Sequence, residues 1–177
     1  MTQSYFTESE WSMLMQAPVQ ALSAVILSDK SDPVAFMKEV RAAVQIMLAE
    51  QQREDLSTDL GRSLMQSFKD KMAAESLQGD ELLMKKVFEY LGSIANLKNA
   101  SEGRKQAMNH LNEVSKILAA KVTVVQANEF RQWLTSLSRK VAESVKEEGF
   151  LGGIGGERIS SQESAALRDI EKALQVI

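Results

Sequence analysis

Apolar residues recur every three or four positions along most of the chain, which is the period of an α-helix. The pattern divides into seven stretches separated by polar or glycine-containing turns. The one β-branched run, at residues 122–125, is too short and too isolated to make a sheet. We therefore predict an all-α fold: a compact bundle of about seven helices, forming a single domain over residues 1–177. The predicted helices begin near Thr7, Asp32, Ser57, Asp80, Ser101, Gln126 and Ser160.

Three of these starts carry specific capping signals. Thr7 with Glu10, and Ser160 with Glu163, have the spacing of a capping box, in which each side chain bonds the other residue's free backbone N–H. Asp32 is followed by a proline, which is typical of an N-cap and the first helical residue. These signals place the first, second and last helices.

Two helices have features that predict their shape or position. Pro18 lies inside the first helix, where it has no N–H to donate, and we expect a kink or a break there with the two parts nearly in line. The fourth helix has the broadest apolar face, so we expect it to lie at the centre of the bundle. That face contains Leu83, Met84, Val87, Phe88, Leu91 and Ile94.

The chain also shows a weak internal similarity. Residues 14–48 have the pattern of a helix, an acidic loop and a capped helix, and residues 130–174 have the same pattern with a longer loop. A pseudo-repeat of two helix–loop–helix units is therefore one hypothesis for the architecture, although the identity between the two segments is slight.

Composition then narrows the classes of partner and location. The net charge of −3 gives no general basic field for nucleic acid or an anionic membrane, and no apolar run approaches the roughly 20 residues of a membrane span. Cysteine is absent, which removes disulfides, and the N-terminus has no secretory signal. We predict a cytoplasmic protein with no nucleic-acid partner and no transmembrane segment.

The sequence contains no recognisable catalytic constellation. Its one histidine, His110, lies beside an apolar helical stripe, and no nucleophile motif accompanies it. Zinc sites built from histidine and cysteine are excluded by the count of those residues. We therefore predict a protein that is not an enzyme and has no cofactor, with a divalent metal as the alternative.

Acidic residues near two interhelical loops are the candidate metal ligands. Such carboxylates provide the hard oxygen ligands that calcium, magnesium and manganese prefer, but the spacing fits no EF-hand. The other interpretation is that they cap helices or remain solvated. The candidates are Asp29, Asp32 and Glu39 at the first loop, and Glu148, Glu157 and Glu163 at the second.

The second loop contains five of the nine glycines, between Gly149 and Gly156, interleaved with Phe150, Leu151 and Ile154. A flexible linker would not carry these apolar side chains. One interpretation is a packed hairpin in which they are buried under the flanking helices. The others are an exposed wedge for a partner or membrane, a weak anion site, and a metal loop.

Two segments resemble the tellurite-resistance TerB-like helical proteins. They are "APVQALSAVILSDKSDPVAFMKEV" and "VAESVKEEGFLGGIGGERISSQESAAL", which both read as helix, loop and capped helix, and together they cover under a third of the chain. The resemblance implies a compact, helical, bacterial protein linked to stress and metal response. The family's acidic Asp-Gly loop is replaced here by "SDKSD". The motif "KEEGFLGGIGG" followed by Ser-x-x-Glu is also similar to a group of uncharacterised bacterial helical proteins.

The function predicted from these observations is a protein-interaction or stress-accessory module, acting on a protein partner or as a homo-oligomer. The alternative is a divalent-metal-binding domain that uses the acidic loops. The state of Phe150, Leu151 and Ile154 separates the two. If these side chains are exposed, they favour a partner or membrane surface; if they are buried, the loop is structural and the acidic turns become the candidate site.

Overall fold

The computed structural model describes residues 2–28, 32–149 and 159–175. Seven α-helices lie in these residues, preceded by a short 3-10 helix, η1, at Thr2–Tyr5, and the same residues contain no strand. The predicted all-α bundle is therefore confirmed. The helices are α1 (Glu8–Ile26), α2 (Pro33–Glu50), α3 (Asp59–Ala73), α4 (Gly79–Ile94), α5 (Ala100–Lys121), α6 (Val124–Gly149) and α7 (Ser161–Leu174).

The predicted caps form at the helix starts. Thr7 N donates to Glu10 at 2.8 Å while Glu10 N donates to the Thr7 hydroxyl at 3.1 Å, which completes the capping box of α1. Ser160 and Glu163 make the equivalent pair at α7. The Asp32 carboxylate accepts from two backbone N–H groups in the first turn of α2. These bonds satisfy donors that a helix start otherwise leaves without partners.

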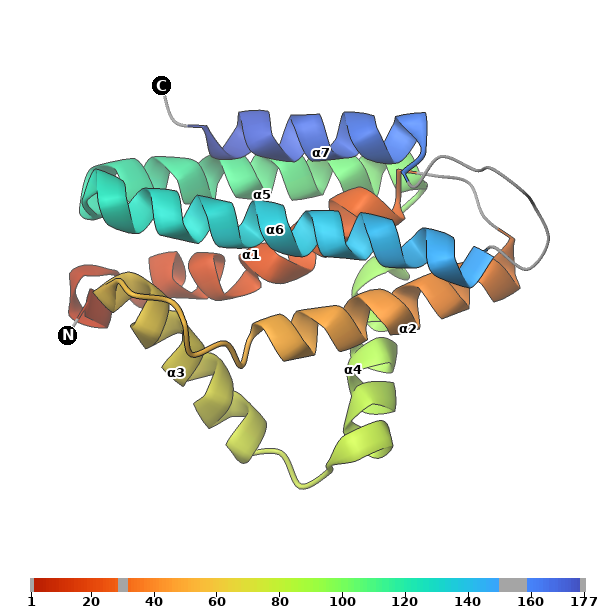
Figure 1. Cartoon of the computed structure of the whole chain (residues 1–177), viewed down its shortest axis with the longest axis horizontal. Helices are drawn as coiled ribbons and strands as arrows, with labels where there is room; N and C mark the ends of the chain where they lie inside the picture. Colours follow the sequence, from red (N-terminus) through yellow and green to blue (C-terminus); the bar gives the residue numbers. More distant parts are fainter. Residues whose placement is uncertain (1, 29–31, 150–158, 176–177) are drawn as a thin grey trace.

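The central helix is α1, which packs on α2, α5, α6 and α7 (Figure 1). It runs unbroken from Glu8 to Ile26, so of the two expected outcomes at Pro18 the break does not occur, and the kink stays a prediction. Pro18 has no N–H, so one backbone hydrogen bond of the helix is missing. The helix continues because buried apolar and small residues pack on both sides of the proline and stabilise it by more than this loss. Ala17 and Ala21 are fully buried there, which lets neighbouring helices approach α1 closely.

The predicted central position of α4 is wrong. This helix packs on α2 at the edge of the molecule, and Phe88 is 63% exposed whereas its neighbour Val87 is 1% exposed. The broad apolar face of α4 is therefore covered on only one side. The prediction assumed that a broad apolar face is buried on several sides. In α4, part of that face is open to solvent.

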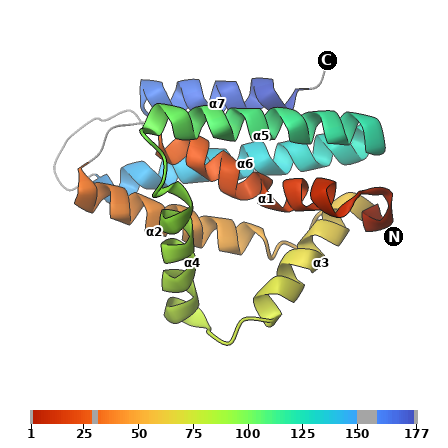
Figure 2. The same ribbon diagram turned by 180° about the vertical axis from the view of Figure 1, so that it is seen from behind.

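Helices α3 and α4 form two arms that extend from the rest of the molecule beside α2 (Figures 1 and 2). The first arm packs on η1 and α6, and the second on α2. All the buried residues of α3 lie between Leu60 and Phe68, so its last turn extends away from the core. The arms are joined at their far ends by residues 74–78.

Both units of the suggested repeat form helix pairs in contact, α1 with α2 and α6 with α7. Contact within each pair is what a repeat requires, and the repeat itself stays a prediction.

In the described ranges, none of the helices combines the length and the apolar character that crossing a membrane requires.

Candidate functional site

Several of the residues singled out in the two loops lie outside the described part of the chain. They are the three apolar residues and one acidic residue of the glycine-rich loop, and one acidic residue of the first loop. The side chain of Glu148 is also outside it, although its backbone belongs to α6. The choice between a packed and an exposed glycine loop therefore stays open. The residues that lie wholly outside the described part are Asp29, Phe150, Leu151, Ile154 and Glu157.

The described metal candidates are engaged elsewhere or lie apart. Asp32 caps α2, and Glu163, only 2% exposed, accepts from Ser160 N at 2.8 Å in its capping box. Glu39 is half-buried on α2. Among the residues that the structure describes, no three histidine, aspartate or glutamate side chains converge as metal ligands. The two carboxylates therefore act as helix caps, as the alternative interpretation expected.

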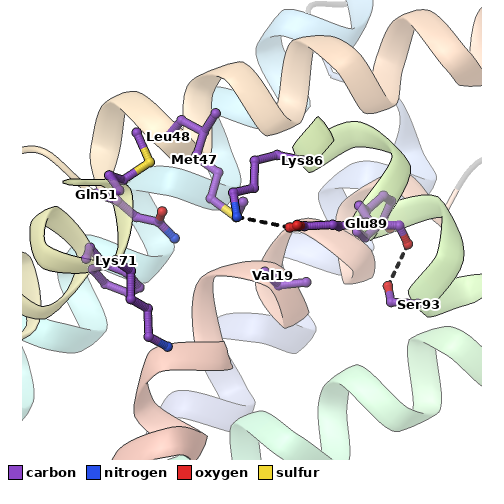
Figure 3. A pocket seen from close by; sticks show the side chains of 11 residues that line it. Val19, Met47, Leu48, Gln51, Lys71, Lys86, Glu89 and Ser93 are labelled. Atoms are coloured by element: carbon purple, nitrogen blue, oxygen red, sulfur yellow. Dashed lines mark hydrogen bonds and ion pairs between the residues drawn. The ribbon is translucent and has the colours of Figure 1, made fainter. Parts of the chain in front are cut away.

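A pocket of about 300 Å³ lies where the two arms meet α1 and α2 (Figure 3). Most of its lining is apolar and comes from all four helices. This origin matters because no single stretch of sequence contains the pocket. The apolar lining residues are Val19 on α1, Met47 and Leu48 on α2, Phe68 and Met72 on α3, and Tyr90 on α4.

Ion pairs hold the arm α4 to the end of α3. Glu75, just after α3, accepts from Lys85 and, at 2.7 Å, from Lys86, and Lys86 also bonds Glu89 at 3.0 Å. These two lysine hydrogen bonds lower the pKa of Glu75 to about 2. Burial lowers the pKa of Lys86, but its bonds to Glu75 and Glu89 outweigh that effect and the net direction is upward. Both groups are therefore fully charged near neutral pH.

The phenol group of Tyr90, which lines the pocket, is held by a hydrogen bond from α1. The buried hydroxyl of Ser23 donates to the Tyr90 oxygen at 3.1 Å, linking α1 to α4. Burial raises the pKa of Tyr90 to about 12, and the hydrogen bond from Ser23 only partly opposes this. Tyr90 therefore remains a neutral phenol whose ring contributes apolar surface to the pocket.

Lys71 is the exposed cation at the mouth of the pocket. It extends from α3 while Lys86 extends from α4, so the two ammonium groups reach the opening from opposite sides (Figure 3). Within the described residues, the ammonium group of Lys71 forms no ion pair or hydrogen bond. An anionic group placed at this mouth would meet a cation that is not already neutralised.

Lys71 also borders a second depression, of about 450 Å³, between η1 and the start of α1. Its apolar lining is Phe6, Trp11 and Met15. Met15 lines this second depression, and Val19, one turn further along α1, lines the pocket. The two depressions therefore follow one another along α1, and Lys71 borders both. We call the two depressions together the α1 furrow.

Sequence reasoning did not find the α1 furrow. Phe68 and Met72 lie four residues apart, a spacing typical of one apolar helix face, yet Phe68 is buried and Met72 only half-buried. The sequence did contain one signal that Met72 lies near the surface: the four residues that follow it, 73–76, are small or polar. Lys71 belongs to no sequence motif, and its position at both depressions depends on the orientation of α3 and α4 relative to α1.

No family model, curated protein or solved structure matches the chain. The resemblance to TerB-like proteins therefore stays a hypothesis based on the two quoted segments.

Proposed function

We propose that this protein is a non-catalytic protein-interaction module and that the α1 furrow is its partner-binding surface. The observation that carries the proposal is the pocket at the arms, whose lining comes from four helices and is mostly apolar, with Lys71, Lys86 and Glu89 as its charged members. Binding sites for apolar anchors of a partner have this arrangement, because the interior supplies affinity and the rim supplies orientation.

The composition of the lining supports a protein partner. Met47 and Met72 are unbranched and polarisable, so they can adjust to the shape of an inserted side chain. The pocket is lined by side chains of several helices, and an amphipathic helix binds such apolar sites through residues on one face. The pocket volume of about 300 Å³ is at the lower end of the range for small-molecule sites, which suits anchoring side chains.

The ionisation states of the pocket favour binding over catalysis. A general acid or base works best when its pKa is near the working pH. Tyr90 has a pKa of about 12, and the pKa of Lys86 is raised by its carboxylate partners. His110 lies on α5, with its ring Nε2 2.8 Å from the Met13 carbonyl oxygen, and does not line the pocket.

A blocking substitution tests this proposal. Ser93 is small and exposed at the edge of the pocket, so Ser93→Trp should fill the entrance without removing a core side chain. Peptides would be selected on the native protein from a random library displayed on phage, then synthesised and measured by fluorescence anisotropy. We expect enriched peptides whose affinity falls at least about tenfold on Ser93→Trp, about 1.4 kcal/mol of binding free energy.

The matched control is Ala73→Trp, an equally bulky substitution at an exposed position of α3 that does not line either depression. It should leave the affinities unchanged. The proposal is wrong if no peptide is enriched, or if the enriched peptides bind native protein and Ser93→Trp equally well. Circular dichroism of both variants verifies that they remain folded.

A further inference from the structure

The α1 furrow has a repeating character that narrows the kind of partner. Trp11, Met15 and Val19 follow one another at four-residue spacing on α1 and line the second depression and then the pocket. They therefore form one side of the furrow. At 1.5 Å per residue, the distance from Trp11 to Val19 along the helix is about 12 Å, or roughly two helical turns.

Each end of the α1 furrow has its own apolar floor. At the pocket end, Phe68 and Tyr90 are buried residues that line the pocket. At the other end, Phe6 and Trp11 pack with their ring centroids 5.6 Å apart. Two separate apolar floors fit two anchoring side chains better than one continuous chain of a small molecule.

The charge between the two floors is positive. Lys71 lines both depressions and has no ion partner within the described residues, whereas the ammonium group of Lys86 is already paired with Glu75 and Glu89. The carboxylates at the same surface are Glu89, which is already paired with Lys86, and Glu8, which lines only the second depression. The whole chain carries a net charge of −3, so this cation is a local feature and not part of a general basic surface.

We propose that the α1 furrow binds a helical segment of a protein partner that carries two apolar anchors about two turns apart and a carboxylate between them. The anchors occupy the two depressions, and the carboxylate pairs with Lys71. This inference rests on the proposed function and adds the chemistry of the partner. A helix presents residues at i, i+4 and i+7 or i+8 on one face, which matches this order of apolar, acidic and apolar groups.

Reversal of the charge on Lys71 tests the inference. The same random peptide library would be selected separately on the native protein and on Lys71→Glu. We expect native-selected peptides to carry Asp or Glu between two apolar residues, and to bind Lys71→Glu at least about tenfold more weakly. Peptides selected on Lys71→Glu should carry Lys or Arg at the same place. Lys71 is exposed, so its replacement should not unfold the protein.

Two further variants complete the design. Lys105→Glu reverses an exposed lysine on α5 that does not line the α1 furrow, and it should change neither the selected sequences nor their affinities. Ser12→Trp fills the second depression from an exposed position, and peptides with two anchors should lose affinity on it as well as on Ser93→Trp.

The outcomes separate this inference from the proposed function. Peptides that are sensitive to Ser93→Trp but carry no acidic residue, or bind equally to Lys71→Glu, would overturn the inference and leave the interaction module standing. Absence of any peptide sensitive to Ser93→Trp would overturn both. Dodecanoate serves as a small amphiphilic probe. Lys71-dependent binding of dodecanoate, with no Lys71-dependent peptide, would also overturn the inference, because the furrow would then be a site for a small amphiphile.

Discussion

At the scale of single residues, a glutamate from one helix organises the start of another. The Glu129 carboxylate on α6 accepts from Ser57 N at 2.6 Å, from the Ser57 hydroxyl at 2.7 Å and from Thr58 N at 3.0 Å. Gly61 leaves the space that this carboxylate occupies, because an added Cβ would lie 2.6 Å from Glu129 Oε2. The position of α3, and hence of one furrow wall, depends on this contact.

Substitution of that glycine gives the first prediction. Gly61→Ala should destabilise the protein by about 1–3 kcal/mol, since the new methyl group must displace either Glu129 or Leu56. The matched control is Gly92→Ala in α4, where a Cβ meets nothing within 4 Å and where alanine should stabilise the helix by up to about 1 kcal/mol. Urea melts of both variants measure the difference. A Gly61→Ala protein as stable as Gly92→Ala would contradict the described packing.

The second prediction concerns acid stability. The folded-state pKa of Glu75 is lowered from 4.5 to about 2 by hydrogen bonds from Lys85 and Lys86. The unfolded state therefore binds the proton more readily than the folded state between these two values. The stabilisation from Glu75 is present above about pH 4.5 and is lost as pH falls toward about 2.

We expect Glu75→Gln to lose less stability than the native protein over that acidic interval, because glutamine has no proton to take up there. The measurement is the free energy of unfolding in urea at a series of pH values. Identical pH profiles for the two proteins would show that the ion pairs at the end of α3 do not persist in solution.

The third prediction concerns metal ions. Asp32 and Glu163 are held at their own helix starts by backbone hydrogen bonds, and within the described residues no three acidic or histidine side chains converge on one point. We expect calcium, magnesium and manganese to bind no more tightly than roughly the millimolar range of the loosest calcium modules. Calorimetric titration, with melting in the presence and absence of EDTA, measures this. Micromolar affinity abolished by Asp29→Asn or Glu163→Gln would favour the metal-binding alternative instead.

At the scale of elements, local sequence predicted the helices and the capping box at either end of the chain. It placed the start of α6 two residues late, although the signal was present: Thr123 and Gln126 exchange hydrogen bonds in the manner of a capping box just before Val124. Capping depends on neighbours in sequence, which is why such features can be predicted. The position of α4 depends on distant helices and was predicted wrongly.

Adjacent residues on α4 give the fourth prediction. Val87→Ala should cost about 1–3 kcal/mol of stability, since Val87 is buried in the core. Phe88→Ala should change stability by less than about 0.5 kcal/mol, although it removes a far larger side chain, because Phe88 is exposed. Denaturant melts of the two variants compare them. A cost for Phe88→Ala above that for Val87→Ala would support the central position expected from sequence.

At the scale of the whole molecule, the functional surface was not predictable because it has no local signature. The α1 furrow combines side chains from η1 and four helices, and it exists because α3 and α4 extend from the body at different angles. Hydrophobic periodicity indicates that Val19, Met47 and Phe68 face other apolar groups, but it does not indicate which ones. The residues with the most distinctive sequence, in the glycine-rich loop, lie outside the described part of the chain.

The most direct test of the α1 furrow as the binding surface is a methyl NMR titration of protein labelled at its nine methionines. Met47 and Met72 line the pocket and Met15 lines the second depression, whereas Met37 on α2 lines neither. On addition of a peptide selected on the native protein, we expect the methyl signals of Met15, Met47 and Met72 to shift while that of Met37 stays in place. Shifts confined to methionines outside the furrow, with those three unchanged, would contradict the account.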